Sequence, residues 1–254
     1  MRRMRRIGIA VGIGLGVHAA FAVAVGSMAW GLATGLQQPL AARSLEPDSA
    51  WWAWLGNVLL LAQFPLLHSW LLTRSGQRLL AALMPGGHGR TLAPSTYVVV
   101  GSLQLSATFW LWQPSGIVWH QPTGWTGAVQ WSLFAAAWLF LVKALYDAGL
   151  GLQTGFAGWW ALLRGRAVDY GPLPTSGLFA RCRQPIYLGF ALVLATAPTW
   201  SPDWLLLAVL WIAYCVVGPR WKEARWARIH GTRFLAYRQR VPYFLPRLGT
   251  RTEP

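Results

Sequence analysis

Two stretches near the C-terminus concentrate charged, amide and aromatic side chains that could bind a polar ligand. The first, residues 177–189, contains Arg183-Gln184-Pro185. The second, residues 220–231, contains Glu223, the one acid among nine basic residues between positions 220 and 251. An arginine can pair with a carboxylate through two parallel hydrogen bonds, and a glutamate accepts hydrogen bonds from amines and hydroxyls. The residue types therefore predict a functional site in these stretches.

A few polar residues fall within or beside long apolar runs, where ionisable groups are costly and are candidates for function. They are His18, Gln63, His68 and Lys143. We expect His18 to be a structural histidine that hydrogen-bonds a neighbouring helix. For His68 the sequence leaves a structural and a substrate-side role open. Lys143 and Asp147 are four residues apart on one predicted helix, so we expect them to pair with each other.

The composition indicates what must position these residues. The chain has 254 residues, of which 55% are hydrophobic and only 11% are charged, with a formal net charge of +15. So few ions cannot cover a soluble surface, and so many apolar residues exclude disorder. A nucleic-acid binder would carry its charge on one soluble face, whereas these charges lie between apolar runs. We therefore predict an integral membrane protein with membrane lipids around it, no nucleic-acid partner and no obligate protein partner.

Apolar runs of about 20 residues can cross the hydrocarbon core of a bilayer as helices. The candidate crossings are residues 7–33, 50–72, 96–112, 127–146, 185–200 and 204–218. The last two are short and are separated by Ser201-Pro202-Asp203, which predicts a tight helical hairpin. The predicted fold is an all-α polytopic bundle of about six spans, followed by a cytoplasmic amphipathic helix over residues 221–240. That helix would place Trp226, Ile229 and Phe234 on one apolar side.

The distribution of basic residues predicts the orientation. With the N-terminus in the cytoplasm and six crossings, 21 of the 22 basic residues lie inside, as the positive-inside rule requires. The exception is Arg43, in a loop that also holds Glu46 and Asp48. We therefore expect a multi-pass protein of a bacterial inner membrane with both termini cytoplasmic. The first apolar run is too long for a secretory signal, so we interpret it as an uncleaved anchor.

Ten tryptophans lie near the proposed outer ends of the spans, where indole rings favour the headgroup level. They are Trp30, Trp51, Trp52, Trp54, Trp110, Trp112, Trp119, Trp125, Trp200 and Trp204. An aromatic belt is the preferred interpretation, and an aromatic substrate cage is the alternative. Cys182 and Cys215 form no metal-binding spacing, so we predict two ordinary thiols and no metal site. The chain is predicted to be one membrane domain, 1–254, with four spans in 1–150 and the hairpin and terminal helix in 177–248.

The segment Arg183-Gln184-Pro185-Ile186-Tyr187-Leu188-Gly189 resembles the Arg-His-Pro-x-Tyr-x-Gly motif of the integral membrane methyltransferases. That superfamily includes isoprenylcysteine carboxyl methyltransferase and the phospholipid N-methyltransferases. Residues 222–231 and 237–246 are similar to its C-terminal ending. Upstream, His68-Ser69, residues 94–97 and residues 110–114 resemble the branch that contains methanethiol S-methyltransferase and NnrU-type membrane proteins. The resemblance covers roughly residues 55–248.

This resemblance implies an enzyme that uses S-adenosylmethionine at the cytoplasmic face and takes its methyl acceptor from the bilayer. The acceptor would be a small or lipophilic nucleophile, with a thiol favoured. The residues implied for catalysis are Arg183, Glu223 and His68. Those implied for cofactor binding are Arg183, Gln184, Pro185, Tyr187, Gly189, Glu223, His230, Gly231 and Tyr237.

The motif departs from the family at four positions: the family's His is Gln184, its first Glu is Lys222, its Phe before Gly is His230, and its first Tyr is Phe234. Gln184 can form hydrogen bonds but cannot act as a base. Lys222 reverses a charge next to a cationic cofactor.

Two other functions remain open from the sequence. The ending Tyr237…Val241-Pro242-Tyr243…Pro246 also resembles that of sterol reductases, in which case Arg225 or Arg228 would hold the 2′-phosphate of NADPH. The other alternative is a non-catalytic membrane homologue whose basic tail binds lipid or a partner. Binding of S-adenosylmethionine or of NADPH would discriminate among the three.

Overall fold

The computed structural model describes residues 2–38, 50–84 and 87–246, and the regular structure of these residues is helical. The loop with Arg43, Glu46 and Asp48 and the chain end from residue 247 lie outside the described residues. The elements are α1 (Arg2–Ala33), α2 (Ala50–Leu71), α3 (Arg74–Ala82), α4 (Gly89–Trp110), α5 (Gly124–Asp147), α6 (Leu150–Gln153), α7 (Phe156–Arg164), the 3-10 helix η2 (Gly177–Ala180), α8 (Pro185–Ala195), α9 (Pro202–Val217) and α10 (Pro219–Arg240).

The chain forms two compact units. The first comprises residues 1–120, 150–170 and 199–204, and the second comprises 121–149, 171–198 and 205–254. Helices α8, α9 and α10 each begin at a proline, Pro185, Pro202 and Pro219. Proline suits the first position of a helix because its fixed φ is helical and the N–H that it lacks would have no partner within the helix. These prolines therefore divide the C-terminal third of the chain into separate helices.

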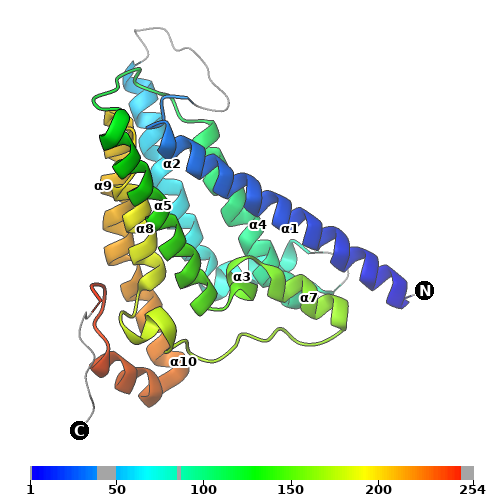
Figure 1. Ribbon diagram of the computed structural model, residues 1–254. Helices are drawn as coiled ribbons and strands as arrows, with labels where there is room; N and C mark the ends of the chain where they lie inside the picture. Colours follow the sequence, from blue (N-terminus) through cyan, green and yellow to red (C-terminus); the bar gives the residue numbers. More distant parts are fainter. Residues whose placement is uncertain (1, 39–49, 85–86, 247–254) are drawn as a thin grey trace. The chain divides into compact units, whose positions relative to one another are not determined.

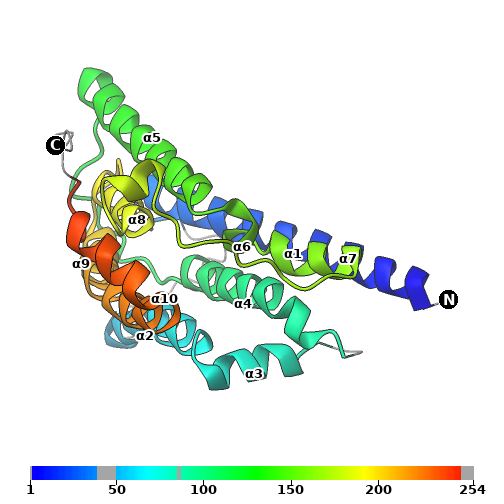
Figure 2. The same ribbon diagram turned by 90° about the horizontal axis from the view of Figure 1, so that it is seen from below.

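In the first unit, α1 packs against α4 and α7, and α7 lies along α1 (Figures 1 and 2). The close approach depends on small residues, since a β-carbon at Gly14 of α1 would lie 2.7 Å from Cδ2 of Trp159 on α7. Small residues at helix contacts are typical of membrane bundles, where backbones approach closely. Helices α2 and α3 meet at a bend of 91°, and the hydroxyl of Thr73 accepts a hydrogen bond from the backbone N–H of Gly76 at the start of α3.

In the second unit, α5 and α8 pack side by side (Figure 1). A β-carbon at Gly189 of α8 would lie 2.9 Å from Cα of Leu141 on α5, so the glycine brings the two backbones together. The 3-10 helix η2 also packs against α5. This packing fixes the segment that immediately precedes α8, which carries the predicted functional residues.

Several long apolar helices indicate a multi-pass membrane protein. Within the described residues, Arg3–Ala33, Gly124–Asp147 and Pro202–Arg240 are long and apolar enough to span, and the bent pair α2–α3 would make a fourth. Helix α4 is not among them, since it carries buried polar residues such as Ser102, Gln104 and Thr108. The two predicted short helices are confirmed as α8 and α9, with 11 and 16 residues. Six crossings and the orientation stay predictions.

The predicted continuous helix over 221–240 is wrong in one respect. Helix α10 is broken at Gly231, whose φ of 52° and ψ of −129° are not helical. Glycine adopts positive φ without the steric cost of a β-carbon, so it allows the turn. After the break Phe234 is buried and its ring lies 6.0 Å from that of Trp226, whereas Ile229 is 65% exposed. The apolar side therefore contains Trp226 and Phe234 but not Ile229.

The tryptophan belt also needs one correction. Trp30, Trp51 and Trp125 are exposed, in agreement with a position in the headgroup layer. Trp112 instead is only 1% exposed, and its indole N–H donates to Oδ1 of Asp203 over 2.9 Å. A buried indole needs a hydrogen-bond acceptor. Trp112 is therefore a core residue of the first unit.

Candidate functional site

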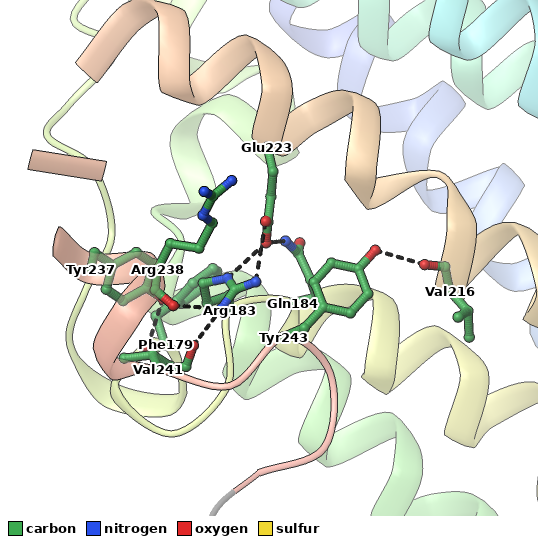
Figure 3. Close-up of polar contacts among 9 residues, drawn as sticks. All are labelled: Phe179, Arg183, Gln184, Val216, Glu223, Tyr237, Arg238, Val241 and Tyr243. Atoms are coloured by element: carbon green, nitrogen blue, oxygen red, sulfur yellow. Dashed lines mark hydrogen bonds and ion pairs between the residues drawn. The ribbon is translucent and has the colours of Figure 1, made fainter. Parts of the chain in front are cut away.

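Arg183 is the centre of a polar cluster in the second unit (Figure 3). Its Nε donates to Oε1 of Glu223 over 2.8 Å, and its Nη2 donates to Oε2 over 3.2 Å. Its Nη1 donates to the carbonyl oxygens of Arg238 and Val241. The backbone N–H of Arg183 also donates to the carbonyl of Pro242 over 2.9 Å. One side chain thus joins the segment before α8, the acid of α10 and the chain that follows α10.

The side-chain amide of Gln184 also donates a hydrogen bond to the carboxylate of Glu223. Its Nε2 donates to Oε1 of Glu223 over 2.7 Å, and the side chain is 0% exposed. Its own carbonyl, Oε1, is buried and has no hydrogen-bond partner within the described residues. An unpaired buried acceptor costs free energy. Gln184 Oε1 is therefore the atom of this cluster that is ready to accept a hydrogen bond from a ligand.

The cluster is closed to solvent. Arg183 and Glu223 are each 8% exposed. A buried ion pair is stable only when most of its donors and acceptors are satisfied, because the desolvation of both charges opposes it. The guanidinium N–H groups of Arg183 donate to protein oxygens, and the cofactor-binding role that the resemblance implies for this residue stays a prediction. A bound carboxylate would have to exchange with these partners.

The last turns of α10 and the residues that follow it close the cluster from the other side. The hydroxyl of Tyr237 donates to the carbonyl of Phe179 over 2.7 Å, and that of Tyr243 donates to the carbonyl of Val216 over 2.6 Å (Figure 3). Tyr237 and Phe234 share a buried apolar cluster with Leu173. Burial raises the pKa of the Tyr243 hydroxyl, so it stays a hydrogen-bond donor at neutral pH. The tail is thereby held over Arg183 by main-chain acceptors.

Lys222, next to Glu223, lies against two aromatic rings. Its Nζ is 5.0 Å from the ring centroid of Tyr187 and 4.6 Å from that of Trp226. The faces of such rings attract cations, more strongly when water is excluded. Tyr187 also meets Tyr214 edge to face, at 6.5 Å between centroids. The second unit therefore contains two ring faces of the kind that attracts cations, and the amine of Lys222 lies against both of them.

The remaining residues implied for cofactor binding have other contacts. Gly189 lies against Leu141 of α5, so its small size has a packing role. The ring of His230 meets that of Trp226 edge to face, at 6.4 Å. Gly231 is exposed at the break in α10. Pro185 is buried as the first residue of α8. Cofactor contacts of these four residues stay predictions.

Asp147 is a residue that the sequence reasoning recognised only in part. The predicted pair with Lys143 is confirmed, with 2.5 Å between Lys143 Nζ and Asp147 Oδ1. The carboxylate also accepts a hydrogen bond from the backbone N–H of Leu178 over 2.8 Å, at the start of η2. A carboxylate at a helix N-terminus satisfies a donor that has no partner within the helix. Asp147 therefore anchors the segment that leads to Arg183.

The two cysteines are free and buried, as predicted for ordinary thiols. Cys182 precedes Arg183 and is 1% exposed. Burial raises the pKa of its thiol, although nearby hydrogen bonding and the positive charges of Lys222 and Arg183 act in the opposite direction. A neutral, buried thiol is a poor nucleophile.

His68 belongs to the first unit, where it meets α4. The hydroxyl of Tyr97 lies 2.6 Å from His68 Nε2. The imidazole ring of His68 stacks on the ring of Phe64, with 4.9 Å between the centroids. Its Nδ1 is buried without a hydrogen-bond partner in the described part of the chain. A role for His68 in catalysis stays a prediction. For His18 the structural expectation is confirmed, since it accepts a hydrogen bond from Trp159 Nε1 over 3.3 Å.

Gln63 forms a neutral network between α2 and α4. Its Nε2 donates to the carbonyl of Gln104 and to the hydroxyl of Thr108, and the amide of Gln104 donates back to Gln63 Oε1 over 2.9 Å. Paired amides of this kind satisfy polar groups inside an apolar bundle and hold two helices together. Gln63 thus has a structural explanation within the first unit.

Comparison with known proteins identifies relatives along most of the chain. No family model matches, and no solved structure matches. The chain is 28% identical to methanethiol S-methyltransferase of Crocosphaera subtropica over 221 residues, which cover 84% of the chain and 83% of that relative. It is 29% identical to methanethiol S-methyltransferase 2 of Bradyrhizobium diazoefficiens, over 81% of the chain and 78% of the relative. It is also 29% identical to methanethiol S-methyltransferase of Pseudomonas deceptionensis, over 80% and 76%. This agreement makes the chain a distant homologue of the methanethiol S-methyltransferases.

Proposed function

We propose that this chain is an integral membrane methyltransferase that uses S-adenosylmethionine to methylate a small or lipophilic thiol. The observation that carries the proposal is the homology to methanethiol S-methyltransferases over about four fifths of the chain. Their name supplies the acceptor class, a small thiol such as methanethiol. The proposed site is the cluster of Arg183, Gln184 and Glu223.

The side chains of the cluster fit the chemistry of such a cofactor. Gln184 Oε1 is a buried acceptor without a partner in the described residues, and an amine or hydroxyl would satisfy it. Tyr187 and Trp226 offer ring faces to a positive charge, and they already hold an ammonium group. The cofactor would supply a sulfonium-bound methyl group that a thiolate displaces, leaving a thioether and S-adenosylhomocysteine.

This chain's residues would contribute by position and by exclusion of water. A methyl transfer from a sulfonium builds no oxyanion, so alignment and a dry site matter most. Arg183 and the tail after α10 would close over the bound molecule, because they already enclose Glu223. A catalytic role for His68, which the resemblance implies, stays a prediction, and within its own unit its Nδ1 is buried without a partner among the described residues.

Binding of the methyl donor is the first experiment. The detergent-solubilised protein would be titrated with S-adenosylmethionine and, in parallel, with NADPH, while its thermal unfolding is followed. A ligand that binds only the folded state raises the unfolding midpoint, and above its Kd the rise grows with the logarithm of the ligand concentration. We expect such a concentration-dependent rise with S-adenosylmethionine. A rise with NADPH alone would favour the reductase. No rise with either would favour a non-catalytic homologue, which the internally satisfied Arg183–Glu223 pair would also suit.

Turnover is the second experiment. Radiolabelled methyl transfer to methanethiol and to longer alkyl thiols would be compared for the wild type, Glu223→Gln and Arg240→Gln. Glu223 is buried in the cluster, whereas Arg240 is exposed at the end of α10 and serves as the control. We expect Glu223→Gln to lose at least tenfold in rate and Arg240→Gln to stay within twofold. Equal rates for all three proteins would remove the cluster from the active site.

The proposed topology has six crossings with both termini in the cytoplasm. The distribution of basic residues supports it, since 21 of 22 would then lie on one side. Reporter fusions after residues 40, 85, 120, 170, 201 and 246 test each crossing separately. We expect alternating periplasmic and cytoplasmic signals, beginning outside. The same side for the fusions after 170 and 201 would show that α8 does not cross.

A further inference from the structure

The first unit has a surface depression of about 440 Å³ that the proposed reaction does not use. It lies along α6, α7 and the residues that follow α7. Most of its lining is apolar or small, and three of its lining residues are charged. The lining residues are Gly151, Phe156, Ala157, Trp160, Ala161, Arg164, Arg166, Ala167 and Asp169.

Helix α7 presents an apolar stripe that ends in a positive charge. Phe156, Trp160 and Arg164 follow one another at four-residue spacing on one face. The rings of Phe156 and Trp160 stack at 5.2 Å between centroids, and the guanidinium of Arg164 lies 4.6 Å from the centroid of Trp160. The opposite face of α7 buries Leu162 against Ala10 of α1. The stripe therefore faces away from the core of the unit.

A third guanidinium group comes from the start of α1. A β-carbon at Gly165, between Arg164 and Arg166, would collide with Nη1 of Arg6, so the Arg6 side chain packs directly on this glycine. The Nε of Arg6 is buried and has no hydrogen-bond partner among the described residues. Asp169 supplies one carboxylate to the lining, so the three guanidinium groups leave an excess of two positive charges. An unpaired buried N–H beside excess positive charge points to an anion.

We propose that this depression binds an anionic phospholipid. Its phosphodiester would accept hydrogen bonds from the guanidinium groups of Arg6, Arg164 and Arg166, and an acyl chain would cover Phe156 and Trp160. A lipid fits better than a soluble anion because most of the lining is apolar. The position of the depression along the membrane normal also fits a lipid. The candidate span of α1 begins at Arg3, close to Arg6, and basic residues at the ends of spans contact lipid headgroups.

The test is a lipid titration of the detergent-solubilised protein, followed by thermal unfolding. Dioleoyl-phosphatidylglycerol would be compared with dioleoyl-phosphatidylcholine and with inorganic phosphate at equal concentration. The variant Arg164→Gln/Arg166→Gln removes two exposed charges from the depression, and Arg74→Gln/Arg78→Gln removes two exposed charges from α3 as the matched control. We expect phosphatidylglycerol to stabilise the wild type and the control. In the depression variant we expect the apparent affinity to fall roughly tenfold or more, since each basic residue near a headgroup contributes about fivefold.

A second variant keeps both charges and fills the space. Ala167→Trp, at an exposed lining position, should also weaken phosphatidylglycerol binding, and it decides the matter if the double variant does not fold. Equal stabilisation of every protein by phosphatidylglycerol would overturn the proposal, because it would indicate a diffuse attraction. A rise with inorganic phosphate equal to that with the lipid would indicate a free-anion site and would overturn it too.

Discussion

Two buried carboxylates, one in each unit, are stabilised in different ways. Asp203 is 0% exposed and accepts hydrogen bonds from neutral donors, namely Gln37 Nε2 at 2.7 Å, Trp112 Nε1 at 2.9 Å and the backbone and side chain of Ser115. Glu223 is paired with the guanidinium of Arg183 and the amide of Gln184. One site is neutral apart from the acid, and the other is an ion pair.

The different partners suit different roles: Asp203 holds chain segments together, and Glu223 belongs to the candidate binding site. The donors to Asp203 come from the residues after α1 and from the segment after α4, so the carboxylate ties these two segments to the start of α9 within the first unit. Glu223 is instead paired with the charged guanidinium of Arg183, a group of the kind that also pairs with carboxylates of ligands. A counter-ion can be exchanged, whereas a set of fixed neutral donors cannot.

The largest expected effect on stability is that of replacing Asp203. Asp203→Ala leaves the indole N–H of Trp112, the amide of Gln37 and the groups of Ser115 without an acceptor, so we expect a loss of about 4 kcal/mol in the free energy of unfolding. Tryptophan fluorescence during thermal unfolding in detergent measures it. Asp203→Asn keeps the shape and removes the charge. Wild-type stability of the alanine variant would show that these donors find other partners.

Loss of the Arg183–Glu223 ion pair should lower the free energy of unfolding somewhat less than loss of Asp203. The size of the effect should depend on whether one partner or both are replaced. Glu223→Ala alone leaves Arg183 buried without its counter-ion, and we expect a loss of about 3 kcal/mol in unfolding free energy. Replacing both residues by methionine should restore most of that stability, since no buried charge is left. The double variant should nevertheless fail to bind S-adenosylmethionine. If it binds the cofactor as the wild type does, the pair is structural only.

Replacement of Lys222 tests whether the rings beside it contact the cofactor. In Lys222→Met the rings of Tyr187 and Trp226 lose their ammonium group and become available to a ligand cation. We expect the affinity for S-adenosylmethionine to rise roughly tenfold, which corresponds to one desolvated cation–π contact of about 1–2 kcal/mol. Lys222→Arg keeps the charge and is the control. An unchanged affinity in Lys222→Met would place the sulfonium away from these rings.

Asp147 should matter more than the lysine paired with it. Asp147→Asn weakens the hydrogen bond to Leu178 N–H and removes the charge, so we expect a loss of about 1 kcal/mol in unfolding free energy. Lys143 is 55% exposed, and Lys143→Met should cost only about 0.5 kcal/mol. Chemical denaturation of both variants tests the order. Equal losses would mean that the lysine pair, and not the cap of η2, is what stabilises this segment.

The smallest effect concerns pH. Burial raises the pKa of the Cys182 thiol above its ordinary value, so the folded state holds the proton more tightly than the unfolded state. The resulting stabilisation is full below the unfolded pKa and is lost as the pH rises toward the folded one. The unfolding midpoint should therefore fall more between pH 8 and pH 10 in the wild type than in Cys182→Ala. An equal fall in both would assign the pH dependence to other groups.

The sequence indicated which polar residues would come together in the second unit better than it indicated their contacts. Arg183, Gln184 and Glu223 were selected from residue type and motif, and they meet in one cluster. The hydrogen bonds that Arg183 and Gln184 donate to Glu223 could not be predicted. The spacing of a motif does not say whether a guanidinium group faces a ligand or a carboxylate of the same chain. The same reason explains Trp112, whose position near a span end indicated the headgroup layer although its indole bonds Asp203.

By itself the sequence determined the all-helical, membrane-type character of this protein, because length and apolar content act locally along each helix. It also placed the start of one helix at Pro185, since proline restricts its own backbone, whereas α9 and α10 begin two residues earlier than the predicted 204 and 221. Only the tertiary structure decided the break at Gly231, the second partner of Asp147 and the burial of Asp203. Each of these depends on which side chains come together from distant segments, and that is set by packing across the whole unit.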